Sequence, residues 1–416
     1  MTMRTDVAII GGGQAGLAMS RCLTDRGIDH VILERGRVGE RWISERWPSL
    51  RLLTPNWMTR LPGHAYAGSD PDGFMASAEF VDVLSGYAQS FDAPVVEGAE
   101  VYSLSRIGSR FLISTSKGTW AARAAVIATG ACDRPNVPDW AGELPDGVLQ
   151  ITPDRYRGAD DLPSGGVLVV GSSATGIQFA EEISTSGRSV VLAAGRHVRA
   201  PRRYRGRDIF HWLDASGFLT DRRPPDADPR HLQSQPSLQL IGTEDGHDID
   251  LHRLAARGVR VVGRALGTTG RLVHLSDELA EECAAAEARR QKLLTRIDAH
   301  IRASGRPVAE EPSAWTAPPP FAGTPTTLDL RANGIETIVW ATGYRRRYPW
   351  LNLPVFRDDG EIRNHGGVTP VEGLYVLGLP FMRHRSSAFI DGVGQDAAAL
   401  SRDILRQLST PTAIAA

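Results

Sequence analysis

Val7-Ala8-Ile9-Ile10-Gly11-Gly12-Gly13-Gln14-Ala15-Gly16 is the stretch of this sequence that decides its fold. Its first four residues are apolar and predict a buried parallel strand, and the glycines allow a tight turn and a close backbone approach to a pyrophosphate. Gly16 allows the helix that we predict over Gln14–Arg26 to pack closely on that strand. Because a helix N-terminus favours an anion, the stretch predicts a dinucleotide-binding strand–turn–helix unit.

An acidic residue stands where such a unit needs one. The next apolar run, His30–Leu33, predicts a second strand, and Glu34 follows it directly. A carboxylate at this position is placed to accept hydrogen bonds from the hydroxyl groups of a ribose. A glycine-rich turn in an unrelated α/β protein would leave Glu34 unexplained. This half of the chain closes with Val126-Ile127-Ala128-Thr129-Gly130.

The same arrangement occurs a second time. Val167-Leu168-Val169-Val170-Gly171-Ser172-Ser173-Ala174-Thr175-Gly176 is another apolar run with a glycine loop, and Val339-Trp340-Ala341-Thr342-Gly343 closes its half. Serine replaces the middle glycine at Ser173, which is a small change in volume. A chain that holds two dinucleotides side by side usually passes electrons between them. We therefore predict a flavoprotein that binds FAD and a nicotinamide cofactor.

Basic residues replace the ribose-binding acid in the second half. The strand predicted over 189–192 is followed by Arg196 and Arg199, and no acid lies in this turn. Guanidinium groups bind a 2′-phosphate in a bidentate manner, so the pattern favours NADPH over NADH. The alternative is a solvent-exposed basic turn without a ligand.

Short alternating strands lie between each glycine loop and its Ala-Thr-Gly tripeptide. They are predicted over 100–104, 110–114 and 119–122 in the first half, and over 259–263 and 271–275 in the second. Alternation with glycine turns is typical of a β-meander. The fold class is therefore α/β, with two Rossmann-like dinucleotide-binding domains of the glutathione-reductase type, each a three-layer parallel sheet plus β-meander, and with the second domain inserted in the first.

The expected FAD-binding domain comprises residues 1–160 and 326–416, and the expected NADPH-binding domain comprises residues 161–325. Residues 276–325 form an insertion in the second domain, with a helix predicted over Ser276–Ser304 and a proline-rich segment over 312–325. This insertion either covers a substrate cavity or packs its apolar stripe against its own domain.

Composition excludes several other classes of protein. Of the 416 residues, 42% are hydrophobic and 23% charged, and a formal net charge of −1 gives no electrostatic basis for binding nucleic acid. No apolar run approaches the roughly 20 residues of a membrane span, and the early first strand leaves no room for a signal peptide. Three scattered cysteines, Cys22, Cys132 and Cys283, predict no disulfide scaffold, metal site or dithiol relay. We expect a cytoplasmic protein, and no coiled-coil pattern indicates an oligomeric state.

With these motifs in place, the whole chain resembles the class B flavin monooxygenases. Three segments carry the resemblance: Gly39-Glu40-Arg41-Trp42 with the following 46–55, Trp340-Ala341-Thr342-Gly343-Tyr344, and the closing strand and helix at 373–378 and 389–396. Within that family the likeness is to bacterial flavoproteins similar to the plant auxin-forming monooxygenases. The candidate cofactor-binding residues are Gly11, Gly13, Gln14, Ala15, Gly16, Glu34, Arg35, Arg41, Trp42, Thr129, Gly130, Gly171, Ser172, Ser173, Ala174, Thr175, Gly176, Arg196, Arg199, Ala341, Thr342, Gly343 and Asp391.

The resemblance also implies two candidate catalytic residues. Asn56 resembles an asparagine that faces the flavin edge, and Asp391 is placed to hydrogen-bond the flavin near the final helix. The alternative roles are structural: Asn56 turns the loop before Trp57, and Asp391 caps the final helix.

By resemblance, the protein is an FAD-containing, NADPH-dependent monooxygenase that forms a flavin hydroperoxide from O2. The oxygen then passes to a small organic substrate, at a soft nitrogen or sulfur atom or at a carbonyl. Tyr156 stands where ketone-inserting enzymes usually carry tryptophan, which disfavours Baeyer–Villiger chemistry.

One departure from the family supports an alternative function. Thr152 or Gln150 occupies the position of a family histidine, although the flanking Trp140-Ala141-Gly142 and Tyr156 keep the pattern. In the family this histidine lies at the domain junction and couples cofactor motion to oxygenation. The alternative is an NADPH-dependent flavin reductase or oxidase without oxygen transfer, and a redox-sensing module that only binds flavin is a third reading.

Overall fold

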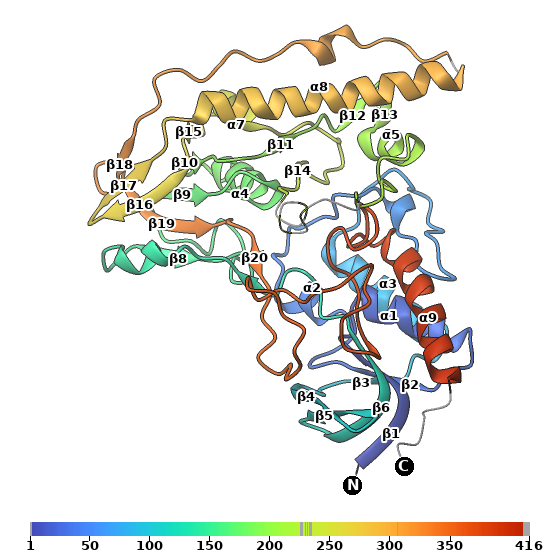
Figure 1. The fold of residues 1–416 in the computed structure, drawn as a ribbon. Helices are drawn as coiled ribbons and strands as arrows, with labels where there is room; N and C mark the ends of the chain where they lie inside the picture. The colour runs from blue at the N-terminus through green and yellow to red at the C-terminus, as the bar shows by residue number, and fades with distance from the viewer. Residues whose placement is uncertain are drawn as a thin grey trace.

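The computed structural model describes residues 2–224, 228, 230, 232, 235–305 and 307–410. It consists of two α/β domains, with the first at the bottom of Figure 1 and the second at the top. The first sheet contains strands from both ends of the chain, so the second domain is inserted in the first. This confirms the expected fold class.

The first sheet has seven strands in the order β3-β2-β1-β6-β5-β4, with β21 beside β6. Strands β3, β2, β1, β6 and β21 are parallel to one another, whereas β4, β5 and β6 form an antiparallel meander. β6 therefore runs from the meander into the parallel sheet. The bounds are β1 Thr2–Ile10, β2 His30–Leu33, β3 Val95–Val96, β4 Val101–Ile107, β5 Arg110–Thr115, β6 Gly118–Ile127 and β21 Leu374–Val376.

The second sheet has five parallel strands in the order β15-β10-β9-β19-β8. A separate three-stranded antiparallel sheet, β16-β17-β18, forms the second meander. The bounds are β8 Leu149–Ile151, β9 Gly166–Val170, β10 Val190–Ala193, β15 Arg260–Val262, β16 Ala265–Thr269, β17 Leu272–Leu275, β18 Thr327–Asp329 and β19 Ile335–Trp340.

Two expectations about the second domain need correction. Residues 259–263 do not belong to a meander, because β15 pairs in parallel with β10; a run this short carries too little periodicity to distinguish the two kinds of strand. The segments 149–151 and 335–340, expected in the first domain, pair with the second sheet as β8 and β19. The strand before the second Ala-Thr-Gly therefore lies beside the strand before the second glycine loop, as in the first domain.

Three helices, α1 Gln14–Thr24, α3 Ser77–Gln89 and α9 Val393–Ser409, pack with the first sheet around one core. Val7–Ile10 are at most 4% exposed, as expected for a buried parallel strand. The helix after the glycine loop runs over Gln14–Thr24, close to the predicted Gln14–Arg26, and it packs against the last helix, as Figure 1 shows. The helices and the short 3-10 turn of this domain are α1 Gln14–Thr24, α2 Glu40–Ser44, η1 Asn56–Met58, α3 Ser77–Gln89 and α9 Val393–Ser409.

The second domain carries a long helix across the top of Figure 1, α8 Leu279–Ser304, which confirms the predicted helix. Its buried residues Leu294 and Ile297 pack on Tyr204 and Phe210, so its apolar stripe covers its own domain. The other elements are β7 Arg134–Pro135, η2 Asp139–Glu143, α4 Ala174–Thr185, β11 Val198–Arg199, β12 Arg203–Tyr204, β13 Arg207–Asp208, α5 Ile209–Ala215, β14 Leu238–Gln239, α7 Leu251–Ala256, η3 Pro312–Trp315 and β20 Tyr344–Arg345.

Candidate functional site

The first glycine loop is wedged between α1 and the end of β6. Gly11 has φ +111°, and a Cβ atom on it would lie 2.6 Å from the Ala128 carbonyl oxygen. A Cβ atom on Gly16 would lie 1.9 Å from the Gly11 carbonyl oxygen, so helix and strand approach to backbone contact. Gly13 is different, because the described chain leaves the space around its Cβ position open. The loop thus keeps an open backbone surface at the N-terminus of α1, which suits a pyrophosphate.

Glu34 lies against this loop, as the sequence predicted. Its carboxylate accepts hydrogen bonds from the Gly12 amide at 2.6 Å and the Gly36 amide at 2.9 Å. The residue is 8% exposed. Each carboxylate oxygen has a second lone pair, so both remain able to accept a ribose hydroxyl. The pair of loop and acid therefore fits the adenosine half of FAD.

The second loop repeats this geometry. Gly171 has φ +108° and would place a Cβ 2.3 Å from the Ala341 carbonyl oxygen, and a Cβ on Gly176 would lie 1.8 Å from the Gly171 oxygen. Ser173 stands at the open position, and its hydroxyl donates to the Ser237 carbonyl at 3.2 Å. The Ala-Thr-Gly segments were visible in the sequence, and the structure supplies their physical role: each alanine carbonyl packs on the first glycine of its loop.

The Gly39–Trp42 segment closes over the first loop. The Trp42 indole N–H donates to the Gln14 side chain at 3.4 Å, and its ring contacts Phe80 edge-on at 4.9 Å. Arg41 binds the Cys132 carbonyl and the Asp133 carboxylate, just beyond Thr129 and Gly130. Arg35 lies further out and forms an ion pair with Glu45 at 2.6 Å. Trp42 and Arg41 thus connect α2 to the two chain segments that border the predicted flavin site.

Asn56 is buried and holds a loop in place. Its side-chain N–H donates to the Asp70 carbonyl at 2.8 Å, and its side-chain oxygen accepts from the Met75 amide at 2.8 Å. Its contact with the flavin edge stays a prediction. Both polar ends of the side chain are engaged by the backbone of residues 70–75.

Asp391 forms a two-bonded ion pair with Arg60, in which the Arg60 Nη2 to Asp391 Oδ2 distance is 2.8 Å. The structural alternative considered for Asp391 is wrong, because Gly392 is the N-cap of α9 and no side chain caps that helix. The flavin contact of Asp391 stays a prediction.

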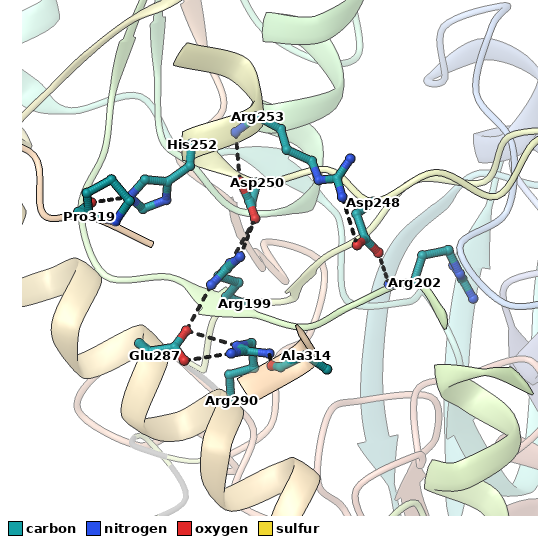
Figure 2. A network of polar contacts seen from close by, with 10 residues as sticks. All are labelled: Arg199, Arg202, Asp248, Asp250, His252, Arg253, Glu287, Arg290, Ala314 and Pro319. Carbon is teal, nitrogen blue, oxygen red and sulfur yellow. Dashed lines mark hydrogen bonds and ion pairs between the residues drawn. The ribbon is translucent and has the colours of Figure 1, made fainter. Parts of the chain in front are cut away.

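The two arginines expected at a 2′-phosphate lie in different surroundings. Arg199 is bound by two carboxylates, Asp250 at 2.7 Å and Glu287 at 2.8 Å, as Figure 2 shows. Glu287 also binds Arg290 of the same helix at 2.6 Å, so Arg199 ties α8 to the start of α7. Arg196 is exposed directly after β10. The ligand contacts of both arginines stay predictions.

The residues around the missing family histidine are structural. Gln150 donates to the Ala141 carbonyl at 3.0 Å and accepts from the Trp340 indole at 3.0 Å. Tyr156 is fully buried, and its hydroxyl donates to Glu182 at 3.0 Å. Burial, together with the Glu182 carboxylate, raises the pKa of Tyr156, so the phenol stays protonated. Neither side chain replaces an imidazole.

Sequence reasoning did not identify Arg202 as a residue that joins the two domains. Its side chain is 1% exposed, lies 4.5 Å from the centre of the Phe74 ring and donates to the Leu53 carbonyl at 2.8 Å. Asp208 binds the same guanidinium. The only sequence signal was the density of arginines over 202–207.

His384 and Asp396 also form a pair that the sequence did not indicate. Asp396 on α9 is fully buried, and the distance from His384 Nε2 to its carboxylate is 3.4 Å. Within the described ranges, no group of histidine, cysteine, aspartate and glutamate side chains has a metal-binding arrangement. No helix of the described chain is long and apolar enough to cross a membrane.

Two glycine loops of this form, each packed on its own Ala-Thr-Gly segment, define a flavoprotein oxidoreductase with two dinucleotide sites. The chain belongs to the family of CzcO-like bacterial oxidoreductases. A family model described as pyridine nucleotide-disulphide oxidoreductase matches residues 8–209, and the chain is similar to the flavin monooxygenase branch that the sequence indicated. FAD and NADPH are the cofactors of this branch, as expected.

Two relatives and one solved structure illustrate these similarities. An uncharacterized CzcO-like oxidoreductase of Geobacillus kaustophilus is 31% identical over 96% of this chain and 98% of its own length. The indole-3-pyruvate monooxygenase YUCCA6 of Arabidopsis thaliana is 30% identical over 50% of this chain and 52% of its own. The solved flavin-containing monooxygenase of Stenotrophomonas maltophilia shares the fold, with a TM-score of 0.67 at 20% identity over 98% of this chain and all of that one.

Proposed function

We propose that this protein is an FAD-containing, NADPH-dependent monooxygenase that forms a flavin hydroperoxide and oxygenates a small organic substrate at a soft nitrogen or sulfur atom or at a carbonyl. The observation that carries the proposal is the repeated cradle: in each domain a glycine loop packs on an Ala-Thr-Gly segment, and in the first domain the Cβ position of Gly13 at the helix N-terminus is open. The names of the relatives, flavin monooxygenase and indole-3-pyruvate monooxygenase, support oxygen transfer.

The residues of the first domain would hold FAD. Glu34 binds the ribose, the loop from Gly11 to Gly16 binds the pyrophosphate, and Trp42 borders the flavin half. In the second domain, the loop from Gly171 to Gly176 and Arg196 would bind NADPH. When bound, NADPH supplies a hydride, and FAD carries the electrons to O2. The three cysteines are unpaired, which suits a reducing cytoplasm.

An NADPH-dependent flavin reductase or oxidase without oxygen transfer is the second candidate. Its support is the region of the missing histidine, where the Gln150 side chain binds Ala141 and Trp340, and the Thr152 carbonyl accepts the amides of Arg155 and Tyr156. A disulfide-reductase version is disfavoured because Cys22, Cys132 and Cys283 do not form a Cys-x-x-Cys pair.

Rapid mixing separates the two candidates. The FAD-loaded protein is reduced with NADPH without oxygen, then mixed with oxygenated buffer while the flavin absorbance and released hydrogen peroxide are followed. A monooxygenase gives a transient absorbance distinct from reduced and oxidised flavin, with little peroxide. Direct reoxidation with about one peroxide per NADPH, unchanged across a panel of amines, thioethers and ketones, would establish the oxidase instead. Protein reduced by light rather than NADPH is the control, because it tests whether bound NADP⁺ protects the transient.

A further inference from the structure

A charged cavity of about 510 Å³ lies at the junction of the two domains. One wall is the loop 70–74 of the first domain, which Asn56 holds from behind. The opposing wall is the β12–β13 hairpin of the second domain, with His211 of α5 beside it. The residues that line the cavity are Arg51, Asp70, Asp72, Gly73, Phe74, Arg202, Arg203, Gly206, Arg207, Asp208, His211, Glu244, Asp245 and Gly246. The lining includes no residue of either glycine loop, so the cavity is separate from the dinucleotide cradles.

Part of the charge in this cavity is neutralised by the protein itself. Arg202 forms an ion pair with Asp208 at 2.5 Å, and Arg51 lies 3.5 Å from Glu244. These pairs leave the remaining charges of the two walls to interact with a ligand.

Four exposed groups of the lining form no ion pair within the described residues. In the part of the chain that the structure describes, Arg203 and Arg207 on the hairpin form no ion pair with a carboxylate. On the loop 70–74, Asp70 and Asp72 likewise form none with a cation. Burial, with Arg207 next to it, lowers the pKa of His211, so this imidazole is neutral near pH 7 and adds hydrogen bonding rather than charge. Two cations therefore line the cavity from the hairpin, and two anions line it from the loop 70–74.

The hairpin is fixed in a strained shape. Arg205 and Gly206 have φ +45° and +75°, which is the primed two-residue turn of a tight hairpin, and a positive φ is costly for arginine. Asp298 of α8 holds the turn by binding Arg205 at 2.9 Å and the Tyr204 hydroxyl at 2.7 Å. The long insertion helix thus positions the cationic wall of the cavity.

We propose that this junction cavity binds a small zwitterion with a carboxylate and an ammonium group, of the α-amino-acid type. Arg203 and Arg207 bind the carboxylate, because guanidinium groups offer paired donors to its two oxygens. Asp70 and Asp72 bind the ammonium group. A ligand with a single charge leaves one wall uncompensated and is selected against. This site is independent of the oxygen-transfer proposal, since its ligand need not react.

Calorimetric titration of the FAD-loaded protein tests the site with three matched probes. L-Norleucine carries both charges, hexanoate carries only the carboxylate and pentylamine carries only the ammonium group. We expect norleucine to bind and the two single-charge probes to bind at least about tenfold more weakly. Absence of norleucine binding, or equal binding of all three probes, would overturn the proposal.

Substitutions in the two walls test whether norleucine binds in this cavity. Arg207→Gln and Asp72→Asn each remove one wall charge at an exposed position, and each is expected to weaken norleucine binding about tenfold or more. Arg271→Gln and Asp277→Asn make the same changes at exposed positions of the second meander and are the controls. Flavin content shows that each variant is folded. Norleucine binding that survives Arg207→Gln and Asp72→Asn unchanged would place the ligand elsewhere and refute the assignment.

Discussion

Gly13 and Gly16 lie three residues apart in one loop, yet the structure gives them different roles. A Cβ on Gly16 would collide with the Gly11 carbonyl at 1.9 Å, whereas Gly13 has open space and an ordinary extended backbone with φ −85°. Gly16 serves the fold, and we infer that Gly13 leaves room for the pyrophosphate.

We expect Gly16→Ala to lower the yield of folded protein, because backbone must move to admit the methyl group. Gly13→Ala should keep the thermal stability of the flavin-free protein but lower its FAD affinity about tenfold or more. Thermal melts of flavin-free protein and FAD titration measure the two effects. Equal FAD affinity for Gly13→Ala and the unaltered protein would contradict this role of the loop.

Arg196 and Arg199 are also expected to have different roles, the first in cofactor binding and the second in stability. Arg196→Gln should raise the KM for NADPH about tenfold with little change for NADH, because a charge-assisted bond to the 2′-phosphate is lost. Arg199→Gln should keep that preference but lower the free energy of unfolding by about 2–3 kcal/mol, because the buried Asp250 loses its partner. Steady-state kinetics with both cofactors and denaturant unfolding measure the split. A loss of NADPH preference in Arg199→Gln alone would reverse the assignment.

At the scale of elements, His247 binds a surface loop to helix α4, which follows the second glycine loop. His247 lies 2.8 Å from Asp245 and 2.9 Å from Glu181 on α4, and Arg257 also binds Glu181. Burial alone would lower the pKa of His247, but the hydrogen bond to Asp245 and the charge of Glu181 outweigh it and raise the pKa above 6.5.

A histidine with a raised pKa stabilises the fold while it is protonated. Its contribution is complete below its unfolded pKa of 6.5 and is lost as the pH rises through the folded value. His247→Gln should therefore destabilise the protein more at about pH 6 than at about pH 9. Thermal melts across this range measure the difference, and His300→Gln on α8 is the control. A difference that grows with pH would show that His247 is bound in its neutral form.

At the scale of the whole molecule, the two domains are joined by polar contacts as well as by the chain, one buried at Arg202 and one exposed at Arg60. Arg202 of the second domain reaches the Leu53 carbonyl of the first, and Arg60 binds both Asp391 and Asp214. Desolvation lowers the pKa of Arg202 and raises that of Asp208, although the ion pair between them opposes both shifts. The contact therefore stabilises the interface only while both partners are present.

Arg202→Met should lower the free energy of unfolding by about 3 kcal/mol or more, because Asp208 is left as a buried charge without its partner. Arg202→Met combined with Asp208→Asn should recover part of the loss. Denaturant unfolding followed by tryptophan fluorescence and by flavin release measures both variants. A single variant as stable as the unaltered protein would show that water or another group compensates Asp208.

The sequence by itself determined the two nucleotide units. Gly11, Gly16 and Glu34 lie within one strand–turn–helix–strand unit, so local geometry fixes their relation, and the same holds for Gly171 and Gly176. The long helix α8 was equally readable, because its apolar spacing repeats over many turns.

Only the tertiary structure decided which charges meet. Arg60 and Asp391 are 331 residues apart, and Arg199 and Glu287 are 88 apart, so no local pattern pairs them. The same is true of the short strands β15 and β19, whose sheet is chosen by neighbours from distant segments. Local periodicity and glycine positions can be read from neighbouring residues. Ion pairs and strand partners join residues distant in sequence, so they are determined only when the domains fold.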